Sequence, residues 1–132
     1  MILVDSNVLI DVMQDDPTWG DWSAAQLQRA RATQKLAINA VILAELSVSY
    51  ENLNEIKGYL DAIGIVTKAV PEEAAFAAGH AFAKYRRRKG VKTCVLPDFL
   101  IGAHAQASGY TLLTRDVARY KTYFPDLALI HP

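Results

Sequence analysis

The sequence predicts an α/β domain with a short, mostly parallel central sheet of four to five strands and helices on both faces. Short apolar runs rich in Ile, Leu and Val alternate with longer stretches that have helical spacing. Capping residues, prolines and glycines stand between these segments, where helices are expected to begin or end. Because no repeat, low-complexity tract or linker interrupts the pattern, we expect a single domain over residues 1–132.

The first half of the chain is expected to contain three strands and four helices. Pro17 breaks the first helix, Asn39 is a good N-cap for the third, and Gly64 stops the fourth. In order, we expect a strand over residues 2–5, helices over 7–13 and 19–32, a strand over 36–38, helices over 40–50 and 51–62, and a strand over 65–67.

The second half continues the alternation. Pro71 fits the first turn of a long helix, Gly90 ends that helix, Pro97 opens the next one and Gly109 closes it. We therefore expect helices over residues 71–89 and 98–108, a strand over 111–114, a helix over 117–123 and a strand over 127–130.

Composition excludes several classes of protein. Hydrophobic residues make up 52% of the chain, which is too many for a disordered protein, and no apolar run approaches the ~20 residues of a membrane helix. The N-terminus lacks the basic and apolar segments of a secretory signal, and Cys94 is the single cysteine, so we expect a cytoplasmic protein with no membrane partner. Lys plus Arg equals Asp plus Glu at 14 each, so nucleic-acid binding would require local basic clusters.

Four carboxylates stand where such a fold could bring them together. Asp5 ends the first predicted strand, Asp116 follows another, Asp98 opens a predicted helix, and Glu45 lies among apolar neighbours inside a second helix. Ligands of parallel sheets bind beyond the carboxyl ends of the strands, which gives Asp5 and Asp116 a physical reason to be neighbours. Each acid also has an ordinary explanation, helix capping for the three aspartates and an extended side chain reaching solvent for Glu45.

A group of carboxylates at apolar surface indicates a cation between them, because unpaired buried charge is costly. An all-oxygen set of ligands suits Mg²⁺ or Mn²⁺. His80, His104 and His131 show no zinc-like spacing, and the chain has no glycine-rich phosphate loop. A carboxylate-bound metal can activate water for phosphodiester hydrolysis.

These segments resemble PIN domains, especially the VapC-type ribonuclease toxins. The resemblance covers nearly the whole chain in the family's order, at residues 4–11 (Val-Asp-Ser-Asn-Val-Leu-Ile-Asp), 44–46 (Ala-Glu-Leu), 96–105 (Leu-Pro-Asp-Phe-Leu-Ile-Gly-Ala-His-Ala), 112–116 (Leu-Leu-Thr-Arg-Asp) and 120–127 (Tyr-Lys-Thr-Tyr-Phe-Pro-Asp-Leu). It implies a PIN-like nuclease domain that acts as a metal-dependent endoribonuclease on an RNA substrate.

The resemblance also implies roles for particular residues. Asp5, Glu45, Asp98 and Asp116 would surround Mg²⁺ or Mn²⁺, and Asn7 and Thr114 would support the site by hydrogen bonding. It further implies a cognate antitoxin protein that blocks the site, and a homodimeric toxin of a type II toxin–antitoxin pair.

A basic cluster before Asp98 is a candidate for RNA binding. It contains Arg86, Arg87, Arg88 and Lys92, and Arg115 could extend it. The ordinary explanation is a solvated helix end, where cations also favour the helix dipole.

Three other functions compete with the toxin. One is a PIN-type RNA-processing nuclease without a toxin role, and another is a non-catalytic RNA- or protein-binding domain. The third, a phosphatase with Asp5 as nucleophile, would usually carry a second aspartate two residues later, where this chain has Asn7.

Overall fold

The computed structural model describes residues 1–88 and 95–132. Its elements are β1 (Ile2–Val4), α1 (Ser6–Met13), α2 (Gly20–Thr33), β2 (Leu36–Ile38), α3 (Ala40–Ser47), α4 (Leu53–Ala62), β3 (Ile65–Thr67), α5 (Glu72–Arg87), α6 (Leu96–Ala107), β4 (Thr111–Leu113), α7 (Ala118–Tyr123) and β5 (Leu129–Ile130). None of the helices in this described part is both long and apolar enough to cross a membrane.

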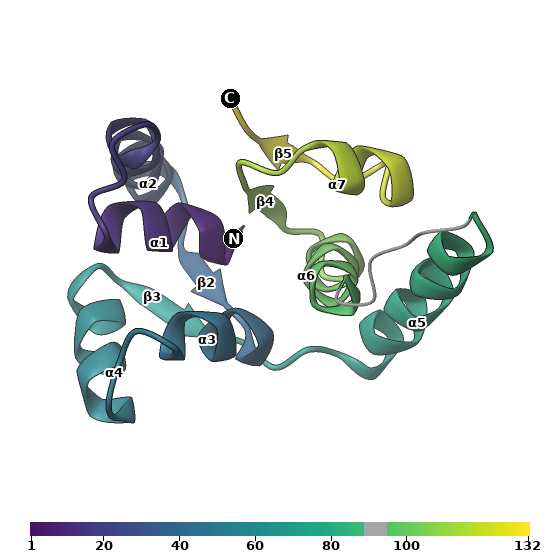
Figure 1. The fold of residues 1–132 in the computed structure, drawn as a ribbon, viewed down its shortest axis with the longest axis horizontal. Helices are drawn as coiled ribbons and strands as arrows, with labels where there is room; N and C mark the ends of the chain where they lie inside the picture. Colours follow the sequence, from purple (N-terminus) through teal and green to yellow (C-terminus); the bar gives the residue numbers. More distant parts are fainter. Residues whose placement is uncertain (89–94) are drawn as a thin grey trace.

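The five strands form one sheet in the order β3-β2-β1-β4-β5, and every pairing is parallel. The chain therefore builds the sheet outward from β1 in one direction and then in the other. Right-handed crossovers consequently place α1–α4 over one face and α5–α7 over the opposite face. Figure 1 shows these two groups of helices on opposite sides of the molecule. The predicted α/β class, with a parallel sheet between helices, is confirmed.

The predicted elements are all present, and several boundaries differ. Asp5 caps α1 instead of ending the first strand, and α1 begins at Ser6. The helix expected over 40–50 ends at Ser47, because Asn52 caps a separate helix by accepting a hydrogen bond from the Glu55 amide. Gly64 and Gly109 follow α4 and α6 with φ of +78° and +68°, which matches their expected role as helix stops.

The second half shows smaller differences of the same kind. Pro71 is the N-cap of α5 and precedes its first turn, and α6 begins at Leu96, two residues earlier than expected. The last strand contains only Leu129 and Ile130. The end of the helix expected over 71–89, including Gly90, lies outside the described residues.

The hydrophobic core is centred on the two middle strands of the sheet, β1 and β4. Leu3, Val4, Leu112 and Leu113 of β1 and β4 are fully buried. Phe99 of α6 is also fully buried and lies within an aromatic cluster that joins α5, α6 and α7. Because burial of such rings stabilises the helix packing, α6 is fixed next to the end of β4. This packing sets where the first turn of α6, with Asp98, meets the sheet.

Candidate active site

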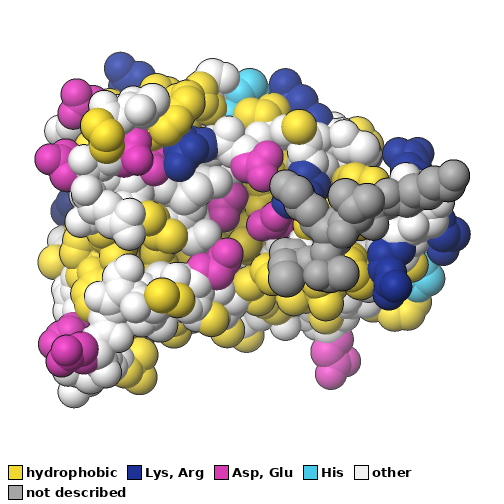
Figure 2. Space-filling view, in the orientation of Figure 1, with side chains coloured by type: hydrophobic (Ala, Val, Ile, Leu, Met, Phe, Trp, Pro, Cys, Tyr) yellow, Lys and Arg dark blue, Asp and Glu magenta, His cyan; other side chains and the backbone are white. Residues whose placement is uncertain are grey.

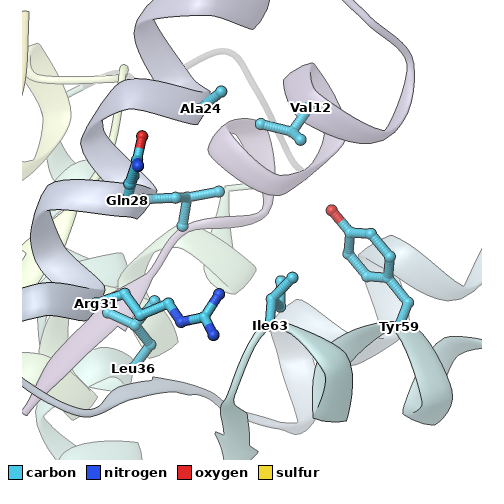
Figure 3. Close-up of a pocket in the computed structure, with 8 residues that line it drawn as sticks. Val12, Ala24, Gln28, Arg31, Leu36, Tyr59 and Ile63 are labelled. Atoms are coloured by element: carbon cyan, nitrogen blue, oxygen red, sulfur yellow. The ribbon is translucent and has the colours of Figure 1, made fainter.

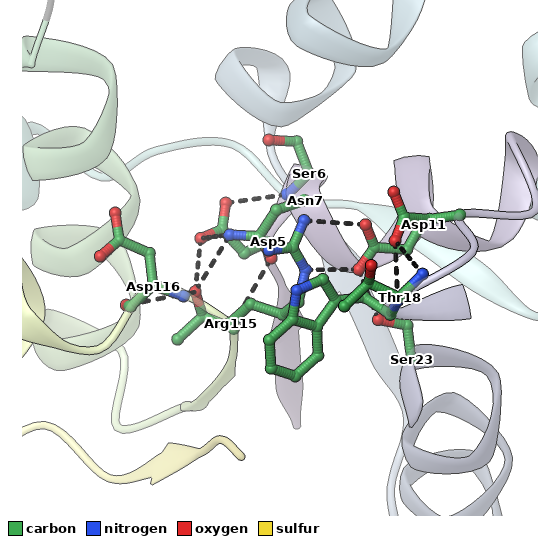
Figure 4. A network of polar contacts seen from close by, with 11 residues as sticks. Asp5, Ser6, Asn7, Asp11, Thr18, Ser23, Arg115 and Asp116 are labelled. Carbon is green, nitrogen blue, oxygen red and sulfur yellow. Dashed lines mark hydrogen bonds and ion pairs between the residues drawn. The ribbon is translucent and has the colours of Figure 1, made fainter. Parts of the chain in front are cut away.

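Asp5 lies at the carboxyl end of β1, with its side chain 3% exposed. Its Oδ1 accepts a hydrogen bond from the Ser6 amide at 2.8 Å. Its Oδ2 accepts from Thr114 Oγ1 at 2.8 Å, from Tyr120 OH at 3.2 Å and from Asn7 Nδ2 at 3.2 Å. Four donors from three elements therefore hold one carboxylate in one orientation, as Figure 4 shows for part of the network.

The environment of Asp5 opposes its ionisation. The pKa of this carboxyl is raised from 3.8 to about 6, mainly by burial and also by the nearby negative charges of Asp98 and Glu45, against the lowering effect of the Thr114 and Tyr120 hydrogen bonds. The electrostatic influence of Asp98 and Glu45 means that the fold brings these carboxylates near Asp5.

Glu45 joins Asp5 through Ser6. Ser6 Oγ donates a hydrogen bond to Glu45 Oε1 at 3.1 Å, while the Ser6 amide binds Asp5. Burial, followed by the charge of Asp98, raises the pKa of Glu45. The structure thus supplies the geometric link between the α3 glutamate and the strand end that the sequence alone lacks.

The position of α3 relative to α6 is fixed by a buried polar contact. Asn39 Nδ2 lies 3.1 Å from His104 Nδ1, and Asn39 Oδ1 accepts a hydrogen bond from the Ile42 amide. The Asn39 amide group is therefore the donor, so the neutral His104 ring accepts at Nδ1. Burial also lowers the pKa of His104, which favours that neutral ring. This contact connects the helix that carries Glu45 to the helix that carries the third acid.

Asp98 and Asp116 lie on the other side of the site. Asp98, in the first turn of α6, forms an ion pair with Arg119 of α7. The Asp116 side chain is 49% exposed, and its Oδ2 lies 3.9 Å from Arg119 Nη1. Asp116 is therefore at the rim of the site, whereas Asp5 is at its buried end.

Figure 2 shows acidic side chains gathered in the middle of one face of the molecule, between the α1–α4 side and α6. Within residues 1–88 and 95–132, however, no three His, Cys, Asp or Glu side chains converge closely enough to hold a metal ion. The acids share one region, and they are not arranged as a finished coordination cage.

The supporting roles expected for Asn7 and Thr114 have matching contacts. Asn7 Oδ1 also accepts a hydrogen bond from the Arg115 amide at 3.2 Å, and Thr114 Oγ1 accepts from the Asp116 amide at 3.0 Å. These bonds connect β1, α1 and the loop after β4 around Asp5.

Arg115 is engaged in a different network (Figure 4). Its Nε and Nη2 donate to the buried Asp11 carboxylate at 2.5 Å and 2.8 Å, and its guanidinium lies over the Trp19 ring at 5.2 Å from the centroid. Ser23 Oγ donates to the same carboxylate at 2.7 Å. These contacts join the loop after β4 to α1 and α2. The proposed contact between Arg115 and RNA stays a prediction.

The basic cluster lies at the end of α5. Arg86, Arg87 and Arg88 are exposed, with Arg86 over the Phe82 ring and Arg88 over the Tyr123 ring at 5.9 Å each. Figure 2 shows Lys and Arg side chains at the α5 end of the face that carries the acids. Lys92 lies outside the described residues.

Sequence reasoning missed three side chains of the site: Ser6, Tyr120 and Arg119. Ser6 stands directly after Asp5, which was the available signal for a second hydrogen-bond donor there. Tyr120 and Arg119 lie on α7, and their approach to the acids depends on how α7 packs against α6.

A separate hollow lies between α1, α2 and α4 (Figure 3). Its volume is about 300 Å³, and its lining is mainly apolar, formed by Val12, Ala24, Leu27, Gln28, Arg31, Leu36, Tyr59 and Ile63. Because this lining contains no carboxylate, the hollow has no part in the chemistry of the acidic site.

Solved structures share the fold over almost the entire chain. VapBC2 from Rickettsia felis bound to a DNA fragment from their promoter aligns with a TM-score of 0.74 and 21% identity, covering 100% of this chain and 99% of that chain. VapBC-1 from nontypeable Haemophilus influenzae aligns with a TM-score of 0.73 and 18% identity, covering 99% and 98%. A toxin–antitoxin complex from Klebsiella pneumoniae aligns with a TM-score of 0.71 and 20% identity, covering 98% and 96%.

No curated protein matches this chain in sequence closely enough to count as a relative. The sequence pattern of the PIN domain, in contrast, matches residues 2–125, which is nearly the whole chain. Three of the acids named by the resemblance, Asp5, Glu45 and Asp98, also lie in one region at the carboxyl edge of the parallel sheet. The chain therefore belongs to the PIN domain family.

Proposed function

We propose that this protein is a metal-dependent endoribonuclease that hydrolyses RNA phosphodiester bonds and acts as the toxin of a type II toxin–antitoxin pair. PIN domains are nucleases, and this family generally uses divalent metal ions. The observation that carries the proposal is that Ser6 binds both Glu45 and the buried Asp5, close enough to Asp98 for its charge to raise the pKa of both. Burying carboxylates close together costs stability, and a divalent cation bound between them would offset that cost.

The donor set fits Mg²⁺ or Mn²⁺. Asp5, Glu45 and Asp98 would hold the ion, since all three offer hard carboxylate oxygens and the charge of Asp98 reaches both Asp5 and Glu45. Asp116, at the exposed rim, would complete the site from the solvent side. When bound, such an ion lowers the pKa of water and stabilises negative charge on a leaving oxygen.

The protein's own residues prepare this site. Thr114, Tyr120 and Asn7 hold Asp5 Oδ2, and the Ser6 amide holds Oδ1, so the carboxylate does not need to reorient. Preorganised ligands of this kind reduce the conformational cost of binding a cation.

Electrostatic attraction would bring RNA to an otherwise acidic centre. We propose that Arg86, Arg87, Arg88 and Lys92 contact phosphates, with Arg115 as a further candidate. Replacing Arg86, Arg87 and Arg88 together by Ala should weaken RNA binding and lower the dependence of log Kd on log salt concentration by about 2, at ~0.7 per lost phosphate contact with single-stranded RNA. An unchanged salt slope in the triple variant would remove α5 from the RNA-binding surface.

The toxin assignment is supported by similarity of fold to components of toxin–antitoxin and VapBC complexes. We therefore propose a cognate antitoxin protein that blocks the acidic site, a homodimeric toxin and a cytoplasmic location. The homodimer is tested by analytical ultracentrifugation of the purified chain, where a monomer at micromolar concentration would contradict it.

The nuclease proposal is tested with purified protein and structured or single-stranded RNA. We expect cleavage with Mg²⁺ or Mn²⁺, none with chelator, and loss of cleavage in Asp98→Asn. Asp126→Asn, which changes an exposed acid outside the site, is the matched control and should cleave as the natural protein does. Equal RNA degradation by the Asp98→Asn variant would attribute the degradation to a contaminating nuclease and would favour the non-catalytic RNA- or protein-binding domain.

The toxin role needs a separate measurement, because an RNA-processing PIN domain would pass the cleavage test. Induced expression should stop growth, and co-expression of the protein encoded beside this gene should restore it. Cleavage in vitro without growth arrest would favour the RNA-processing function.

A further inference from the structure

A positive charge already occupies one side of the acidic site. Arg119 extends from the first turn of α7, and its Nη1 forms an ion pair with Asp98 Oδ2. The same Nη1 lies 3.9 Å from Asp116 Oδ2, so one guanidinium bridges the two acids. The Arg119 side chain is 19% exposed, so this guanidinium is largely shielded from solvent while it contacts the two acids.

The bridge divides the site into two halves with different electrostatics. Asp98 and Asp116 share the charge of Arg119, while Asp5 and Glu45 on the other side are held by hydrogen bonds from Ser6.

A divalent ion and Arg119 would compete for the carboxylate of Asp98. Asp98 Oδ2 binds Arg119, whereas a bound metal ion would lie ~2.1 Å from an oxygen of Asp98 and from oxygens of the other carboxylates. In the described residues, no three acids converge in this way. The guanidinium of Arg119 explains why these acids do not converge, because it holds the Asp98 side chain toward α7.

We infer that Arg119 is an internal counter-cation, which neutralises Asp98 and Asp116 in the metal-free protein and must leave Asp98 when the divalent ion binds. This inference rests on the proposed metal site. Arg119 therefore lowers the affinity for metal while it stabilises the metal-free fold. Its ion pair is suited to exchange, because both partners retain solvent contact and such pairs are weak.

The test measures Mn²⁺ binding by isothermal titration calorimetry on the full chain. Arg119→Met removes the charge and keeps the apolar stem, and Lys121→Met makes the same charge change at an exposed position of the same helix. We expect Arg119→Met to bind Mn²⁺ about fivefold more tightly, which is the size of coupling that a partly exposed ion pair can supply. Lys121→Met should bind as the natural protein does, since its charge is screened by solvent.

Thermal unfolding gives a second readout that does not depend on activity. In chelator, Arg119→Met should unfold at a lower temperature than Lys121→Met, because its carboxylates lose their counter-charge. In saturating Mn²⁺ this difference should shrink or reverse, because the metal stabilises the state that it binds. Arg119→Lys, which keeps the charge, should resemble the natural protein in both measurements.

The outcomes separate this inference from the proposed function. If the natural protein binds Mn²⁺ and Arg119→Met binds no more tightly than Lys121→Met, the competition is refuted and the metal site stands. Tighter binding in both variants would indicate a general charge effect and would also refute the competition. If none of the proteins binds Mn²⁺, the proposed metal site itself is refuted, and this inference with it.

Discussion

Replacing Asp5 by Asn should make the metal-free protein more stable at neutral pH. Asp5 is buried near Glu45 and Asp98, so its ionised form is the costly one. Asn has nearly the same shape and carries no charge. The hydroxyl groups of Thr114 and Tyr120, which donate to Asp5 Oδ2, can rotate to accept from the new amide group. Asn7 Nδ2 loses its acceptor in the variant, which reduces the gain in stability.

The magnitude follows from the pKa of Asp5. A rise from 3.8 in the ordinary state to about 6 in the folded protein corresponds to about 3 kcal/mol, at ~1.4 kcal/mol per pKa unit. Because the folded state binds the proton more tightly than the unfolded chain, this contribution favours folding at low pH and is lost as the pH rises from about 4 to about 6. Asp5→Asn should therefore match the natural protein near pH 4 and exceed its stability by up to about 3 kcal/mol at pH 7.5.

Urea unfolding in chelator, repeated at several pH values, measures this difference. Asp126→Asn removes an exposed carboxylate and serves as the control, with no pH-dependent difference expected. In Mn²⁺ the order should reverse, since the natural protein gains metal binding and Asp5→Asn loses a ligand. A stability difference that stays constant from pH 4 to pH 7.5 would refute the reasoning from burial.

Three further substitutions test the framework around the acids. Gly102→Ala should destabilise the fold by about 1–3 kcal/mol in urea unfolding, because the added Cβ would lie 2.6 Å from the Phe124 ring. Arg115→Met should cost about 3 kcal/mol by the same assay, since it leaves the buried Asp11 carboxylate without its guanidinium. Asn39→Ala should cost about 2 kcal/mol by removing the cap of α3 and its bond to α6, and it should weaken Mn²⁺ binding as Glu45 loses its fixed position. An unchanged free energy of unfolding in any of the three variants would show that the corresponding contact does not stabilise the fold.

The fold was accessible from the sequence because its signals are local. Asn39 marks a helix start by the hydrogen bond of its own side chain, Gly64 and Gly109 mark helix ends by their positive φ, and the structure confirms all three. The ends of helices and strands were harder to predict from the sequence where they depend on a neighbouring helix or strand. The helix expected over residues 40–50 stops at Ser47 because Asn52 starts another helix, and β5 is limited by its pairing with β4.

The site was accessible in part, for the same reason. Sheet topology brings Asp5 and the region of Asp116 to one edge, which the positions of strand ends predict. The connection to Glu45 depends on a single hydroxyl group, that of Ser6, and no pattern of spacing specifies which way a serine side chain points. The contact of Arg119 with Asp98 depends on the packing of α7 against α6, which is a property of the tertiary structure.

Two arginines four residues apart show how packing assigns different roles to the same residue type. Arg115 binds the buried Asp11 with two nitrogens and lies against Trp19, so its guanidinium has both its charge and its face satisfied. Arg119 contacts a partly exposed Asp98 and a more distant Asp116. The first pair is costly to open because it would leave Asp11 charged and buried, whereas the second can open toward solvent. Arg115 thus fixes the loop that precedes α7, and we propose that Arg119, held on that loop's far side, exchanges its place with a metal ion.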